Sequence, residues 1–192
     1  SALLSAESGV IDVHGLMLSL LGDAEAHGAV IVYRSPFEWA EPAPAGWRIR
    51  VGGGAGAGEP FELQSRWLVN SAGLQAQAVA ARMAAYPASR IPPHHWAKGN
   101  YFKLQGRAPF GHLIYPVPVQ GGLGVHLTLD LQGQAKFGPD VEWVDSLDYR
   151  VAPERADVFY AAVRRYWPGL QDHTLVPDYA GIRPKLSGPG DA

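Results

Sequence analysis

The sequence of 192 residues has no cysteine and little net charge, and each shortage excludes a class of protein. Without cysteine there is no disulfide scaffold, no thiolate zinc site and no cysteine nucleophile. The 16 Lys and Arg against 18 Asp and Glu give a formal charge of −2. The basic face that phosphate binding needs is therefore missing, and we expect no nucleic acid partner. Hydrophobic residues make up 47% of the chain, which is typical of a folded globular protein.

The sequence also lacks a long apolar run. The longest stretches, 13–21 and 29–33, are bounded by glycine and charged residues well before the ~20 residues that a membrane span needs, so no transmembrane segment is predicted. No basic region precedes an apolar run, as it would in a signal peptide. The absence of cysteine is compatible with a cytoplasmic location, which we expect. The chain opens on Ser1 and stops in a turn-like segment, so we expect a piece of a larger protein.

The first third of the chain has the pattern of an α/β fold. Asp12 can cap a helix whose apolar residues recur every three or four positions, and Gly28 stands where that helix would end. The apolar run 29–33 then predicts a buried strand. The Pro- and Ala-rich stretch 38–46 indicates a connection. The predicted buried face of the helix consists of Val13, Leu16, Met17, Leu20, Leu21 and Ala24.

A glycine-rich segment, 52–58, separates two predicted strands at 47–51 and 61–65. It contains a literal dinucleotide pattern, G-x-G-x-x-A, at Gly52, Gly54 and Ala57. That fingerprint works only where the glycines open a helix whose amides meet a pyrophosphate. Here the chain continues into alternating strand residues, so we interpret the segment as a surface hairpin loop.

A predicted strand at 67–70 leads into the small residues Ser71, Ala72 and Gly73 and then into a predicted helix at 74–85. Small residues at a strand-to-helix turn let another group approach the backbone, and the new helix presents free amides there. An ordinary connection that uses glycine for its turn geometry is the alternative.

The prolines of 86–93 restrict the chain and mark a predicted lobe boundary. Beyond it the short apolar runs are typical of an antiparallel sheet, with strands predicted at 100–104, 113–117, 123–131 and 135–137. A last helix is predicted from Pro153 to the Pro168-Gly169 pair. Its predicted buried face consists of Val158, Phe159, Ala162, Val163 and Tyr166.

Two side chains stand out as chemical candidates. Alternation in the 123–131 strand puts His126 on its polar face, where an imidazole can accept a proton from a hydroxyl that is being oxidised. Arg183, stiffened by the proline after it, can clamp a carboxylate with two parallel hydrogen bonds. A half-exposed sheet histidine and a surface arginine are the plainer alternatives. No metal site is predicted, because no acidic partner stands at ligand spacing from the adjacent His94 and His95.

Several short motifs occur together across nearly the whole chain. In order they are Ser8-Gly9-Val10-Ile11-Asp12, Leu68-Val69-Asn70-Ser71-Ala72-Gly73-Leu74, Lys98-Gly99-Asn100-Tyr101-Phe102, Leu113-Ile114-Tyr115-Pro116-Val117-Pro118, Leu123-Gly124-Val125-His126-Leu127-Thr128, Phe137-Gly138-Pro139-Asp140 and Gly181-Ile182-Arg183-Pro184. With them the chain resembles the D-amino-acid-oxidase-type (DAO) family of FAD-dependent oxidoreductases, and within it the L-2-hydroxyglutarate oxidase or dehydrogenase branch.

The resemblance implies an α/β fold in three parts. Residues 1–85 would form a partial FAD-binding domain, 86–177 a substrate-binding lobe built as a mostly antiparallel sheet with helices, and 178–192 a segment returning to the FAD domain. It also implies roles for individual residues. Ser71, Ala72, Gly73, Phe37 and Gly181 would bind the cofactor, His126 would be catalytic, and the substrate would meet Arg183, Tyr115, Asn100 and Lys98.

The activity implied by the resemblance is hydride transfer from the alpha carbon of a small 2-hydroxy acid to FAD. His126 would take the hydroxyl proton and Arg183 would hold the carboxylate. An amine substrate of the same family would need no base, and no motif identifies the electron acceptor. The family's initial strand, G-x-G-x-x-G and helix are not in this sequence, so we expect the 192 residues alone to bind FAD weakly or not at all and to be inactive.

A second class of function stays open from the residues themselves. The aromatic side chains of the sheet lobe would then form the contact surface of a binding or assembly module, since aromatics are enriched in interface cores. The candidates for that surface are Trp96, Phe102, Tyr115 and Trp143.

Overall fold

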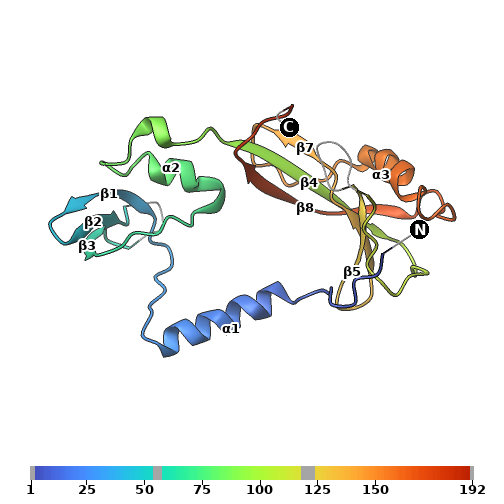
Figure 1. Ribbon diagram of the computed structural model, residues 1–192, viewed down its shortest axis with the longest axis horizontal. Helices are drawn as coiled ribbons and strands as arrows, with labels where there is room; N and C mark the ends of the chain where they lie inside the picture. The colour runs from blue at the N-terminus through green and yellow to red at the C-terminus, as the bar shows by residue number, and fades with distance from the viewer. Residues whose placement is uncertain (1–2, 54–57, 118–123, 191–192) are drawn as a thin grey trace. The chain divides into compact units, whose positions relative to one another are not determined.

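The computed structural model describes residues 3–53, 58–117 and 124–190 (Figure 1). The chain divides into two compact units, one of residues 1–22 with 95–192 and one of residues 23–94. Each unit has its own sheet, and every pair between named strands is antiparallel. The predicted α/β class with a mostly antiparallel sheet lobe is confirmed.

The unit of residues 23–94 is built on a three-stranded sheet of order β1-β2-β3. Its strands are β1 (Phe37–Ala43), β2 (Gly46–Val51) and β3 (Phe61–Ser65). The two predicted strands are confirmed, but the prediction of a connection at 38–46 is wrong. Pro42 is tolerated because β1 is an edge strand, and Glu41 and Glu38 form cross-strand ion pairs with Arg48 and Arg50.

Two predicted strands of this unit are absent from the part of the chain that the structure describes. Residues 29–33 and 67–70 are irregular, and Val30 and Trp67 expose 82% and 81% of their surfaces. A strand forms only where a neighbour accepts its backbone hydrogen bonds, and neither segment has one here. Of the dinucleotide pattern rejected above, Gly54 and Ala57 lie outside the described residues.

The predicted helix at 74–85 is shorter than expected. It consists of the 3-10 turn η1 (Gly73–Gln75) and α2 (Ala76–Ala80). The proline break holds a further 3-10 turn, η2 (Ala88–Arg90).

Helix α1 (Val13–Ala26) begins and ends where the sequence predicts. The Asp12 carboxylate accepts a hydrogen bond from the Gly15 amide at 3.0 Å, and Gly28 follows with a φ of 85°. The prediction of a buried apolar face is wrong, since no residue of α1 is buried. Apolar side chains leave water only where another element supplies a matching surface, and within the described ranges none covers this helix.

The unit of residues 1–22 and 95–192 is built on a five-stranded sheet around one long central strand, β4 (His95–Leu104). β8 (Leu175–Lys185) pairs with β4 along its whole length, while β6 (Ala135–Gly138) and β7 (Glu142–Val144) pair with its two ends. β5 (His126–Leu129) pairs with β6. The sequence did not predict β7 or β8, and 113–117 contributes only a bridge between Ile114 and Leu127.

One face of this sheet forms the hydrophobic core. Helix α3 (Ala156–Val163), entered through the 3-10 turn η3 (Pro153–Arg155), covers this face. It begins where the sequence predicts, but it ends at Val163 rather than at the predicted Pro168-Gly169 pair. Phe159 and Val163 of α3 are fully buried there, and the ring centroid of Phe159 lies 4.6 Å from that of Phe102. Val158, also predicted to be buried, is 57% exposed. Because Phe102 is fully buried, its predicted place in the contact surface of a binding module is wrong.

The predicted boundary at 177/178 falls inside β8. The strand pairs with β4 on both sides of that point, at Pro177 with Phe102 and at Ala180 with Asn100. The division into a substrate lobe and a returning segment concerns roles in the family's fold and stays a prediction. None of the helices in the described ranges is long and apolar enough to cross a membrane.

Candidate functional site

The face of the five-stranded sheet opposite the core carries the candidate site. In β5 and β6, His126 stands directly opposite Gly138, and Phe137 stands opposite Phe102 of β4. Side chains alternate along each strand, so Gly138 and Tyr101 share the face of His126. A Cβ on Gly138 would lie 2.7 Å from the Tyr101 ring, which places the two side by side. His126, Gly138 and Tyr101 therefore form a row across the sheet.

β8 continues this row and brings in Arg183. The pairing of β4 with β8 shifts register between Asn100 and Phe102, and at this bulge the Tyr101 and Tyr179 rings stack with centroids 4.4 Å apart. Gly181 stands opposite Gly99, and Arg183 opposite Ala97. Alternation along β8 then puts Arg183 on the same face as the stacked tyrosines.

Tyr115 covers His126. Their ring centroids are 4.1 Å apart, and His126 exposes only 6% of its surface whereas Tyr115 exposes 61%. Tyr115 therefore shields part of the imidazole from solvent.

The two stacked tyrosines keep their phenol protons. The pKa of Tyr101 is raised, mainly by burial and next by the neighbouring Tyr179, although the charge of Arg183 acts in the opposite direction. Burial also raises the pKa of Tyr179, with the Asp178 carboxylate as the second cause. A protonated phenol donates a hydrogen bond, so this face offers neutral donors beside a cation.

The structure thus brings four of the predicted site residues to one face: His126, Tyr115, Arg183 and Gly181. Sequence reasoning missed Tyr101 and Tyr179. Their signal was the alternation of tyrosine, glycine and arginine at positions 179, 181 and 183. Pro177 and Pro184 interrupt this alternation, but an edge strand accepts proline, and β8 is one.

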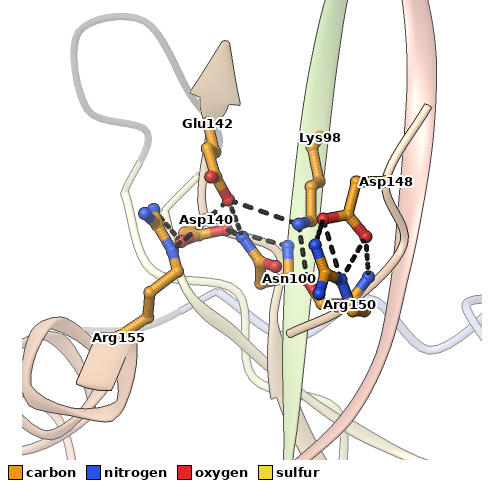
Figure 2. Close-up of polar contacts among 7 residues, drawn as sticks. All are labelled: Lys98, Asn100, Asp140, Glu142, Asp148, Arg150 and Arg155. Atoms are coloured by element: carbon orange, nitrogen blue, oxygen red, sulfur yellow. Dashed lines mark hydrogen bonds and ion pairs between the residues drawn. The ribbon is translucent and has the colours of Figure 1, made fainter. Parts of the chain in front are cut away.

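Lys98 and Asn100 lie on the opposite face of β4, the face of Phe102. Figure 2 shows them within a network of charged groups. The Lys98 ammonium donates to the Arg150 carbonyl at 2.5 Å and lies 3.8 Å from the Glu142 carboxylate. Their predicted contact with substrate stays a prediction, but the structure does not bring them to the face of His126.

The same network fastens the start of α3 to the sheet. The Asn100 side-chain amide donates to Asp140 at 3.0 Å and to Glu142 at 2.8 Å, and the Asn100 backbone amide donates to Asp140 at 2.8 Å. Arg155 of η3 pairs with Asp140 and lies 3.7 Å from Glu142. Two cations thus balance two carboxylates at a partly buried site, so each charge has a partner that offsets its desolvation.

The predicted cofactor residues of the smaller unit lie on its surface. Ser71, Ala72 and Gly73 are exposed, and Asn70 shapes their turn. The Asn70 side chain accepts a hydrogen bond from the Ala72 amide at 3.2 Å and donates to the Ala76 carbonyl at 2.8 Å. Gly73 has a φ of 55°, and no atom lies within 4 Å of the position that a Cβ would take.

Phe37 begins β1 and is half-buried, and its carbonyl accepts a hydrogen bond from Arg82 at 3.3 Å. In the described ranges no three His, Asp or Glu side chains come together as a metal site requires.

Comparison with known sequences gives a family match over the full chain. The model of the DAO family, described as FAD dependent oxidoreductase, matches residues 1–192. The chain is 40% identical to an L-2-hydroxyglutarate dehydrogenase, mitochondrial, from Arabidopsis thaliana, with 98% of this chain and 46% of that protein aligned. It is 26% identical to an L-2-hydroxyglutarate dehydrogenase from Salmonella houtenae, over 95% of this chain and 50% of that one. The chain therefore spans about half the length of these curated relatives.

Solved structures share the fold at lower identity. The glycerol-3-phosphate dehydrogenase from Bacillus halodurans complexed with FAD has a TM-score of 0.68 and 18% identity, over 89% of this chain and 35% of that one. The L-alpha-glycerophosphate oxidase from Mycoplasma pneumoniae with FAD bound has a TM-score of 0.61 and 15% identity, over 78% and 38%. With the family match over every residue and the relative at 40% identity, the chain belongs to the FAD-dependent oxidoreductases of the DAO family.

Proposed function

We propose that the protein represented by this chain oxidises a small 2-hydroxy acid of the 2-hydroxyglutarate type to the 2-keto acid, with FAD as cofactor. The observation that carries the proposal is that His126 and Arg183, from β5 and β8, share one face of the five-stranded sheet. Both relatives named above are L-2-hydroxyglutarate dehydrogenases, which supports this substrate class.

One feature of Gly181 is compatible with its assigned role in holding FAD. Gly181 has no positive φ that would require glycine, and nothing lies within 4 Å of the position of a Cβ. The missing side chain therefore leaves bare backbone on the face of Arg183, where a flat ring can approach closely. In the unit of residues 23–94, Ser71, Ala72 and Gly73 form an exposed turn, and their role in cofactor binding, like that of Phe37, is proposed from the resemblance alone.

Arg183 is the proposed carboxylate clamp. A guanidinium presents paired donors in a fixed plane that matches the two oxygens of a carboxylate. Arg183 is exposed, so its donors are open to a ligand, and the protonated phenols of Tyr101 and Tyr179 lie on the same face. Fixing the carboxylate there also fixes the position of the alpha carbon. Such positioning of the reacting atom raises the rate of the reaction.

His126 is the proposed base. Oxidation of a 2-hydroxy acid breaks the O–H bond of the hydroxyl group and the C–H bond of the alpha carbon, and it forms a carbonyl between that oxygen and that carbon. The proton of the hydroxyl moves to a ring nitrogen of His126, while the hydride leaves the alpha carbon. When bound, FAD supplies the two-electron acceptor for that hydride. Tyr115, which packs on the imidazole, restricts how the ring can turn.

The test uses the full-length protein with L-2-hydroxyglutarate. His126→Gln should lower kcat by about 10²–10⁴, the contribution of a general base, and Arg183→Lys should raise KM because the paired donors are lost. His14→Gln, at an exposed histidine of α1, is the matched control and should leave turnover unchanged. Unchanged turnover in His126→Gln would show that no base is needed there, as expected for an amino-acid oxidase, and the hydroxy-acid assignment would fall.

A further inference from the structure

Lys136 of β6 reaches across the sheet to β8. In register it stands opposite Thr128 on one side and Lys103 of β4 on the other, which puts it on the face of His126 and Tyr101. Its ammonium lies 3.1 Å from the Asp178 carboxylate, an ion pair that links β6 to the bulge of β8 over the strand between them.

A second carboxylate and an aromatic ring complete the surroundings of this ammonium. Asp130 lies 3.8 Å away, and the centroid of the Tyr179 ring lies 5.3 Å away. Only 25% of the Lys136 side chain and 18% of the Asp178 side chain are exposed, so solvent screens their ion pair only in part.

Tyr179 is consequently held by two neighbours. The ring of Tyr101 stacks on it at an interplanar angle of 10°, and the Lys136 ammonium interacts with the same ring as a cation with a π face. The ion pair with Asp178 fixes the residue just before Tyr179 in the chain. The backbone and the ring of Tyr179 are thus both constrained at the bulge, two positions before Gly181 and four before Arg183.

We propose that Lys136 is a positioning residue of the hydroxy-acid site: by holding Asp178 and the ring of Tyr179, it keeps the tyrosine stack in place as the wall beside Arg183 against which the substrate carboxylate binds. This inference rests on the proposed function. Lys136 touches neither substrate nor cofactor in this role. Its own charge is matched by Asp178 and Asp130, so it is not itself a second carboxylate clamp.

The perturbation is Lys136→Met, which keeps the length and apolar stem of the side chain and removes the ammonium. Loss of the ion pair and of the cation–π contact frees Tyr179, so we expect the affinity for the acid to fall about tenfold. KM should rise by a similar factor while kcat changes less, because the base and the guanidinium remain. Lys136→Arg keeps both contacts and should restore affinity to within about twofold of the wild type.

The experiment measures binding of glutarate to the full-length protein by calorimetry. Glutarate carries the carboxylates of the proposed substrate but no hydroxyl, so it reports binding without oxidation. Lys103→Met is the matched control, since this lysine lies opposite Lys136 on the same face. Asp178→Asn breaks the same ion pair from its other end and should weaken glutarate as Lys136→Met does, which separates the effect from misfolding of a single variant.

Three results would overturn the inference: glutarate affinity unchanged in Lys136→Met, an equal loss in Lys103→Met, or no glutarate binding by the wild-type protein. Isotope-labelled tyrosine signals give an independent readout, because the resonances of Tyr101 and Tyr179 should move in Lys136→Met and stay in Lys103→Met. A protein that binds glutarate with this pattern and oxidises no 2-hydroxy acid would refute the proposed function and leave the role of Lys136 standing.

Discussion

Replacing Phe159 by alanine tests whether α3 holds the sheet that carries the candidate site. Phe159 is fully buried, and its ring meets that of Phe102 with centroids 4.6 Å apart. Truncating a buried phenylalanine removes its transfer free energy and leaves a cavity, at a cost of about 3–5 kcal/mol. Domains have about 5–15 kcal/mol of stability in total, so the loss should be a large part of the whole.

The assay is urea unfolding of the 192-residue chain, followed by tryptophan fluorescence. Trp167 packs edge-on against Phe110 with centroids 5.6 Å apart, so its emission reports on this unit. In a thermal scan the same change should lower Tm by about 6–20 °C, from about 2–4 °C per kcal/mol for a chain of this size.

Val158→Ala is the control, because Val158 is the preceding residue of α3 and is 57% exposed. It should change the free energy of unfolding by less than about 0.5 kcal/mol. Equal losses in the two variants would mean that α3 does not pack on the sheet as described. The assignment of the opposite face as the open one would then lose its basis.

Four further outcomes follow from single residues. Burial raises the pKa of Tyr166 above the ordinary value of 10.0, so as the pH rises the unfolded chain releases that proton before the folded chain does. The free energy of unfolding should therefore fall as the pH rises above 10, and it should fall less in Tyr166→Phe. Urea unfolding midpoints measured across that pH range check this. Asp140→Asn should cost about 2 kcal/mol in urea unfolding, since a charged acceptor of buried hydrogen bonds is lost, whereas Asp148→Asn, in an exposed pair, should cost nothing measurable. Gly46→Ala should cost more than about 1 kcal/mol, because its φ is 138° and a Cβ would lie 2.2 Å from a backbone oxygen. Gly181→Ala should leave unfolding unchanged and weaken FAD retention in the full-length protein.

Local signals in the sequence were sufficient where one element decides its own structure. The cap at Asp12 and the glycine at Gly28 predicted the ends of α1, and Pro153 predicted the start of the last helix. Short apolar runs and alternation predicted β2, β3, β5, most of β6 and the second half of β4. Each of these depends on contacts or propensities within a few residues along the chain.

The failures share a different cause. The run 29–33 has the composition of a strand and lacks a partner strand among the described residues, while β8 has two prolines and becomes a strand because β4 pairs with it throughout. Strand formation depends on a neighbour that can be far away in the sequence. Composition alone therefore predicts a strand at 29–33, where none forms, and fails to predict β8, where one does.

The candidate site divides in the same way. The sequence by itself determined the family, through motifs spread along the chain, and it singled out His126 and Arg183 from the chemistry of their side chains. Only the tertiary structure decided that these two share a face with Tyr101, Tyr179 and Tyr115, and that Lys98 and Asn100 do not. The physical reason is that a residue's face is set by strand register and by a bulge between β4 and β8, two chain segments about 80 positions apart.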